Sequence, residues 1–150
     1  MGSSQEAIAW HEAGHAVAYV VHRLPIRYVT IRPRTGDASG LTAVYRPRLI
    51  DSFVSAVIAA AGPGGEQWGY EAMGHPEDEA EWLVGFLGGS GHDEDTIAQC
   101  WSGPRLQITE VTTTVMSPHR GAVACVAATL VASPRALTGV QVRELVAAES

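Results

Sequence analysis

The segment from about Ser4 to Arg23 places the strongest constraint on this 150-residue chain, because its pattern fits a long and largely buried helix. It contains no proline before Pro25, and its Ala, Ile and Val residues spread around most of a helical wheel. Ser3 and Glu6 have the spacing of a capping box, which is typical of a helix start. We therefore expect the chain to open with a helix that is buried on most of its sides.

Two histidines lie inside this segment at a spacing that carries chemistry. His11 and His15 are four residues apart, so on a helix both imidazoles project from one face, one turn apart. Such a pair can hold one Zn²⁺ at bond lengths of roughly 2.0–2.1 Å. Glu12 can then act as a general base on a water that the metal activates. Gly14 costs about 1 kcal/mol of helix propensity relative to Ala, so we expect another segment to approach closely there.

The third protein ligand that a zinc hydrolase needs is not supplied by this helix. In the extended pattern H-E-x-x-H-x-x-G-x-x-H, glycine and histidine would stand at positions 18 and 21. The chain has Ala18 and Val21 instead. The third ligand must therefore come from a distant segment.

Three stretches in the first two thirds of the chain resemble the peptidase domain of FtsH-type ATP-dependent zinc proteases. Residues 9–18, Ala-Trp-His-Glu-Ala-Gly-His-Ala-Val-Ala, are followed by the run Tyr-Val-Thr-Ile-Arg-Pro at 28–33. Residues 61–67, Ala-Gly-Pro-Gly-Gly-Glu-Gln, are similar to the family's next helix. Residues 89–98 stand where the family has a loop and a helix that opens with the third zinc ligand, an aspartate. The order and spacing of these landmarks agree with the family from about Gln5 to Trp101.

The resemblance implies roles for three acidic residues. The third ligand is Asp93 or Asp95. The residue four positions after the ligand lies one helical turn below it and faces the core. This residue is the apolar Ile97 if the ligand is Asp93 and the polar Gln99 if it is Asp95, so we favour Asp93. Glu66 is expected to orient a ligand histidine through its second ring nitrogen, the alternative being an exposed glutamate on a helix.

The remaining sequence predicts a mainly α fold (α+β) in a single domain, residues 1–150, with a small two- to three-stranded sheet packed on the helix that carries the histidines. Runs rich in β-branched residues predict strands at 28–32 and 41–46, the second at the edge of the sheet. Pro63 is expected to kink or split the second helix. Thr138 and Gln141 form another capping box. Further helices are expected at about 51–70, 76–86, 92–101, 104–116, 118–132 and 138–148.

Composition excludes several classes of function. The net charge is −6, and all ten basic residues are arginines, which argues against a nucleic-acid partner. The apolar run 121–133 is shorter than the ~20 residues of a membrane span and is followed by Pro134, so we expect no span. Cys100 and Cys125 are too few for a disulfide framework, and with no signal-peptide pattern at the start we expect a cytoplasmic protein.

The large aromatic residues Trp68, Trp82 and Trp101 are interpreted as core residues.

These observations together predict a zinc-dependent metalloendopeptidase with one Zn²⁺ held by His11, His15 and Asp93. Within the given sequence we find no phosphate-binding loop, so we expect the chain to cleave flexible peptides or unfolded proteins without ATP. A separate ATPase partner is compatible with the sequence but not indicated by it. The alternative is a zinc-binding regulatory or partner-binding domain with little or no proteolytic activity.

Overall fold

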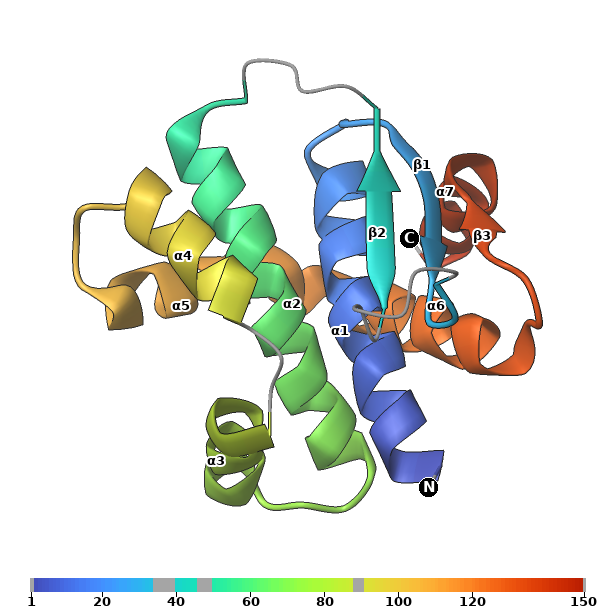
Figure 1. The fold of residues 1–150 in the computed structure, drawn as a ribbon, viewed down its shortest axis with the longest axis horizontal. Coiled ribbons are helices and arrows are strands. Elements are labelled where there is room, and N and C mark those ends of the chain that lie inside the picture. Colours follow the sequence, from blue (N-terminus) through green and yellow to red (C-terminus); the bar gives the residue numbers. More distant parts are fainter. Residues whose placement is uncertain (1, 34–39, 46–49, 88–90, 150) are drawn as a thin grey trace.

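Helix α1 (Gly2–Val21) lies in the middle of the molecule, with a small sheet on one side and helix α2 (Ser52–Ala72) on the other (Figure 1). The computed structural model describes residues 2–33, 40–45, 50–87 and 91–149. The fold is mainly helical, as the sequence predicted. The remaining elements, in chain order, are β1 (Ile26–Thr30), β2 (Leu41–Val44), α3 (Glu77–Leu87), α4 (Gly91–Cys100), α5 (Arg105–Met116), the short 3₁₀ helix η1 (Ser117–His119), α6 (Arg120–Ala132), β3 (Leu137–Thr138) and α7 (Gly139–Ala148).

Helices α1 and α2 pack closely because glycines line both sides of their contact. A Cβ atom on Gly14 of α1 would collide with the carbonyl oxygen of Ala61, and one on Gly65 of α2 would lie 2.5 Å from the carbonyl oxygen of Trp10. The expected close approach at Gly14 is therefore confirmed. It brings the middle of α2 directly against the turn of α1 that carries the two histidines.

Pro63 was expected to kink or split the second helix, and the split is not observed. Helix α2 is continuous from Ser52 to Ala72, with Pro63 buried inside it. A proline in a helix interior costs about 3 kcal/mol because it removes one hydrogen bond and crowds the preceding turn. The close contact with α1 on either side of Pro63 holds the helix together across that defect.

The sheet has three antiparallel strands in the order β2-β1-β3, so β2 lies at its edge. Strand β1 is set two residues earlier than expected, because Ile26 and Val29 are the residues that the core buries. Strand β2 ends at Val44; the predicted end at Arg46 lies outside the described residues. Helix α1 begins at Gly2; the Ser3 side chain lies outside the described part of the chain, so the capping box expected there stays a prediction. The capping box of Thr138 and Gln141 is present.

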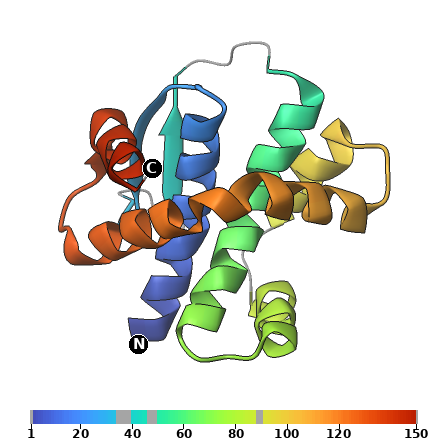
Figure 2. The same ribbon diagram turned by 180° about the vertical axis from the view of Figure 1, so that it is seen from behind.

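Helices α5 and α6 cross α1 and α2 on the face that Figure 2 turns toward the viewer, and they join through η1 into one helical run, Arg105–Ala132. By length and composition alone this run could cross a membrane. A single helix of this kind is weak evidence, and its residues Val123, Val126 and Leu130 are buried in the core that α1 shares. The expectation of no membrane span stays a prediction.

Candidate metal centre

The two histidines of α1 are both oriented from α2. His15 Nδ1 lies 2.9 Å from the carbonyl oxygen of Ile58, and His11 Nδ1 lies 2.9 Å from Glu66 Oε1. A carbonyl oxygen only accepts, so Nδ1 of His15 donates its proton there, and an ionised Glu66 accepts one from His11 in the same way. With Nδ1 protonated, the lone pair of each neutral imidazole is on Nε2, which is the atom a metal needs.

The two Nε2 atoms and one carboxylate oxygen converge on a single point. His11 Nε2 and His15 Nε2 lie 3.1 Å apart, and Asp93 Oδ2 lies 2.9 Å from the first and 3.3 Å from the second. Asp93 comes from the first turn of α4, which packs beside α2 (Figure 1). We call these residues the His–His–Asp cluster; their side chains are only 11, 12 and 14% exposed, in the order His11, His15, Asp93.

This donor set fits a zinc ion. The lone pairs of the two Nε2 atoms and of the Asp93 oxygen repel one another at these distances unless a cation lies between them. That cation can be a proton or a metal ion. Two imidazole nitrogens and a carboxylate oxygen are a common ligand set for catalytic zinc, which leaves a fourth position open. Among the described residues, this is the one group of His, Cys, Asp and Glu side chains whose ligand atoms are close enough to share an ion; they all lie within 4.8 Å of one another.

Gly62 of α2 provides the space in front of the two histidines. A Cβ atom on Gly62 would collide with His15 Nε2 and lie 2.8 Å from His11 Nε2. A side chain at residue 62 would push the two rings out of the arrangement in which their Nε2 atoms converge. The absence of a side chain at residue 62 is therefore a further reason why the cluster can accept a metal.

Neighbouring charges shift two pKa values in the cluster. Burial lowers the pKa of His11, but its hydrogen bonds with Asp93 and Glu66 and the nearby charge of Glu12 outweigh burial and raise the pKa to about 10. Burial raises the pKa of Asp93, but hydrogen bonds from His11 and His15 outweigh it and hold that pKa well below its usual range. Without metal, one proton thus takes the place of a cation between a histidine and a carboxylate.

Zinc binding is therefore expected to release about one proton at pH 7, because the His11 ring must lose its proton before Nε2 can bind the ion. Since the raised pKa of His11 lies near 10, the zinc affinity should rise about tenfold per pH unit between pH 7 and 9 and then level off. Calorimetric titration in two buffers of different ionisation enthalpy measures the released proton. A binding enthalpy that is the same in both buffers, after dilution correction, would contradict this expectation.

Of the other predicted site residues, Glu12 and Glu66 lie at the cluster, whereas Asp95 does not. Glu12 is buried (8% exposed) next to the cluster on α1, and its carboxylate accepts a hydrogen bond from the Thr42 hydroxyl at 2.9 Å. Glu66 Oε1 lies 2.9 Å from Nδ1 of His11, the second ring nitrogen of a predicted ligand, and Glu66 is buried and not the exposed helix glutamate of the alternative. Asp95 is exposed and is not among the clustered residues, whereas Ile97 is buried as expected, one turn after Asp93.

Three residues of the site were not found from the sequence: Ile58, Gly62 and Thr42. Ile58 contributes a backbone oxygen, for which no side-chain pattern exists. Gly62 stands directly before Pro63, where the sequence predicted a kink or a break in the helix. A threonine in a short strand, such as Thr42, has no distinctive signal either. Position 62 could have been identified from the run Gly-Pro-Gly-Gly, because glycines on a helix also permit close approach of another element.

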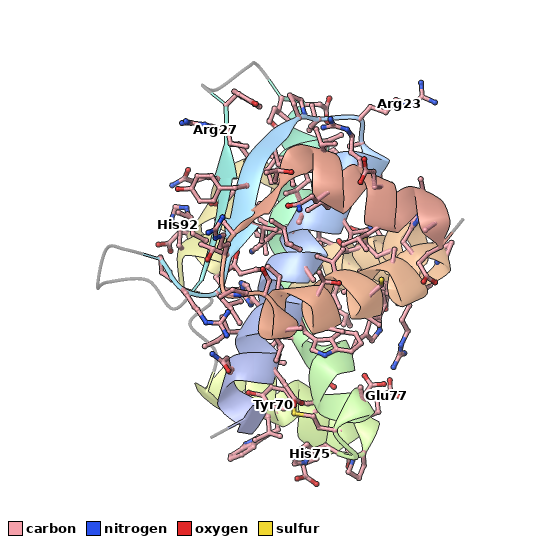
Figure 3. The ribbon with its side chains drawn as sticks, turned by 90° about the vertical axis from the view of Figure 1, so that its right-hand side faces the viewer. Arg23, Arg27, Tyr70, His75, Glu77 and His92 are labelled. Carbon is pink, nitrogen blue, oxygen red and sulfur yellow. The ribbon has the colours of Figure 1, made fainter. Side chains whose placement is uncertain are left out.

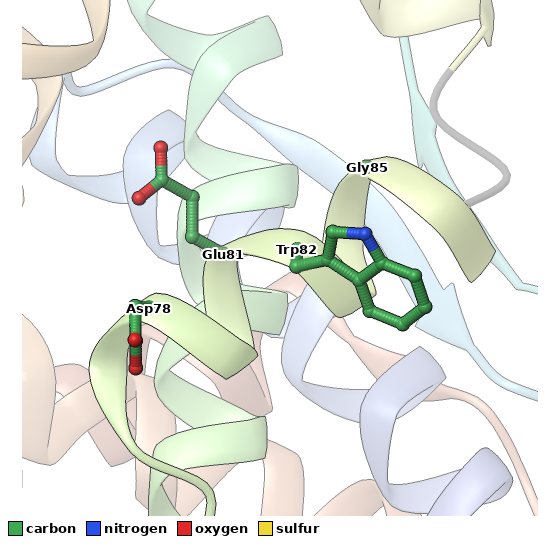
Figure 4. A pocket seen from close by; sticks show the side chains of 4 residues that line it. All are labelled: Asp78, Glu81, Trp82 and Gly85. Carbon is green, nitrogen blue, oxygen red and sulfur yellow. The ribbon is translucent and has the colours of Figure 1, made fainter.

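The remaining features of interest lie outside the cluster. His92 is exposed, although it precedes Asp93, and Tyr70 and His75 pack together near the connection between α2 and α3 (Figure 3). Trp82 is 59% exposed, so its assignment to the core is wrong. It lines a shallow hollow on α3 with Asp78, Glu81 and Gly85 (Figure 4), and that hollow shares no residue with the His–His–Asp cluster.

No protein-family model matches the chain, and no curated protein sequence matches it either. The functional argument therefore depends on the geometry of the cluster and on the chemistry of its residues.

Proposed function

We propose that the chain is a zinc-dependent metallopeptidase whose single Zn²⁺ is held by His11, His15 and Asp93. The convergence of their three ligand atoms beside a buried glutamate is the observation that carries the proposal. A site built only to hold zinc would need no further buried carboxylate beside its ligands, whereas the charge of Glu12 lies near His11. When bound, zinc would lower the pKa of a water molecule and polarise the carbonyl group of a peptide bond.

The residues of the chain then have separate tasks in the hydrolysis. Glu12 removes a proton from the attacking water and passes it to the amine that leaves, so that the peptide bond is replaced by a carboxylate and an amine. Glu66 and the carbonyl oxygen of Ile58 keep the histidine rings in the orientation in which their Nε2 atoms converge, so that both could hold the ion.

The substrate we propose is an extended, unfolded segment of polypeptide. Strand β2 is the edge strand on the side of α1 that carries Glu12, and it shows exposed apolar side chains at Leu41 and Val44. An edge strand can pair with the main chain of a peptide, which a stable folded protein keeps in its own hydrogen bonds. The chain is thus expected to cleave flexible peptides slowly and without ATP, and to spare folded proteins.

The experiment measures hydrolysis of a quenched fluorescent peptide of unstructured sequence by the zinc-loaded protein. Glu12→Gln should lower kcat by about 10²- to 10⁴-fold, the usual contribution of a general base, while one zinc per chain is retained. Glu144→Gln, the same exchange on an exposed part of α7, is the matched control and should keep full activity.

Two results would decide against the peptidase. If the wild type binds zinc but shows no turnover of the peptide, the protein is better described as a zinc-binding domain that regulates or binds a partner. If Glu12→Gln keeps wild-type turnover, the hydrolysis has another origin than this site.

A further inference from the structure

The Glu12 carboxylate is held by a residue of the neighbouring sheet. The Thr42 hydroxyl lies 2.9 Å from Glu12 Oε1 and 3.3 Å from the backbone carbonyl oxygen of the same residue. Both of these oxygens accept, so the Thr42 hydroxyl is the donor, and the shorter distance favours the carboxylate. One oxygen of the glutamate is therefore fixed by Thr42, which leaves Oε2 as the oxygen available to a water molecule.

Gly40, the residue just before β2, lies close to the Glu12 side chain. A Cβ atom on Gly40 would lie 2.6 Å from Glu12 Cγ and 3.0 Å from Glu12 Oε2. The segment from Gly40 to Thr42 thus passes directly over the glutamate, with a bare backbone at one end and a hydroxyl donor at the other. Glu12 is only 8% exposed, which restricts the number of rotamers open to it.

Strand β2 is also the edge of the sheet. Among the described residues it pairs with β1 alone, through the register that sets Thr42 opposite Val29, so its other edge remains open to a further strand. The strand that would receive a peptide in the proposed function is therefore the strand that holds Glu12 in place.

We propose that Thr42 is a positioning residue: it fixes the Glu12 carboxylate for proton transfer and links the edge strand that receives the substrate to the general base. This inference depends on the proposed peptidase function and adds to it a residue outside the metal ligands. Thr42 acts through Glu12, so its removal should change the rate of the chemical step and leave zinc binding intact. Substrate affinity should also be unchanged, because the backbone edge of β2 is still present.

The test compares four variants of the zinc-loaded protein with the quenched peptide as substrate. Thr42→Val replaces the hydroxyl by a methyl group of similar size and keeps a residue that favours strands. Thr42→Ser keeps the donor. Gly40→Ala pushes on the carboxylate from the other side. Thr30→Val is the matched control, because it makes the same exchange on β1, where the hydroxyl accepts a hydrogen bond from the backbone N–H of Arg32.

We expect kcat of Thr42→Val to fall about 10- to 100-fold, the range seen when a group that orients a metal-site residue is lost. KM should stay within about twofold and zinc content at one per chain, Thr42→Ser should recover most of kcat, and Gly40→Ala should lower kcat like Thr42→Val. The Thr30→Val control should match the wild type.

Several outcomes would overturn the inference: unchanged kcat in Thr42→Val, a loss in Thr42→Ser as large as in Thr42→Val, or an effect confined to KM. These outcomes all require an active wild type. Absence of zinc-dependent turnover in the wild type would instead reject the peptidase function itself and this inference with it. Measuring the wild type therefore distinguishes a failure of the peptidase function from a failure of the Thr42 inference alone.

Discussion

Replacing Gly62 by alanine is expected to abolish tight zinc binding while the chain still folds. The added methyl group would collide with Nε2 and Cε1 of the His15 ring and lie 2.8 Å from His11 Nε2. The rings cannot turn away freely, because their Nδ1 atoms are held by Ile58 and Glu66. We expect the zinc affinity to fall by more than about 100-fold, since the substitution acts on the ligands themselves.

The chain offers a matched control two residues along the same helix. A Cβ atom on Gly64 would meet nothing within 4 Å. Gly64→Ala should therefore keep one zinc per chain and raise the free energy of unfolding by about 0.5–1 kcal/mol, because alanine is the better residue in a helix interior. Zinc content by mass spectrometry and chemical denaturation measure the two effects. Equal zinc affinity in Gly62→Ala and Gly64→Ala would show that the histidine rings do not need the free space at residue 62 in order to bind the metal.

Asp93→Asn is expected to weaken zinc binding as strongly, with Asp95→Asn as its control. Asparagine has the size of aspartate but lacks the negative charge, and Asp93 Oδ2 is the oxygen that faces both Nε2 atoms. Asp95, two residues later on α4, is exposed and lies outside the cluster. Competition with a zinc chelator should show a loss of more than about 100-fold for the first variant and no loss for the second. The reverse order would transfer the third ligand to Asp95.

Local spacing was enough to predict the part of the site that one helix makes. His11, Glu12 and His15 are neighbours on α1 whatever surrounds them, because four residues are about one helical turn. The partners from α2 and β2 depend on which backbone atoms and which short polar side chains the packing brings near, and a spacing rule contains no such information. Ile58 and Thr42 are of this kind.

The errors in the fold have the same physical origin. The run around Pro63 has poor helix propensity, yet α2 continues through it because its glycines let it pack tightly on α1. The position of β1 was displaced by two residues because its β-branched content extends past the strand, whereas burial of Ile26 and Val29 decides where pairing occurs. In both cases tertiary packing outweighed local preference.

The most direct measurement for the central claim is the position of zinc in crystals of the zinc-loaded protein, found from anomalous scattering at the zinc absorption edge. The account predicts one strong peak per chain, about 2.0–2.1 Å from Nε2 of His11 and of His15 and in contact with an oxygen of Asp93. A peak at another place, or ordered crystals of the zinc-loaded protein with no peak between these three residues, would contradict it.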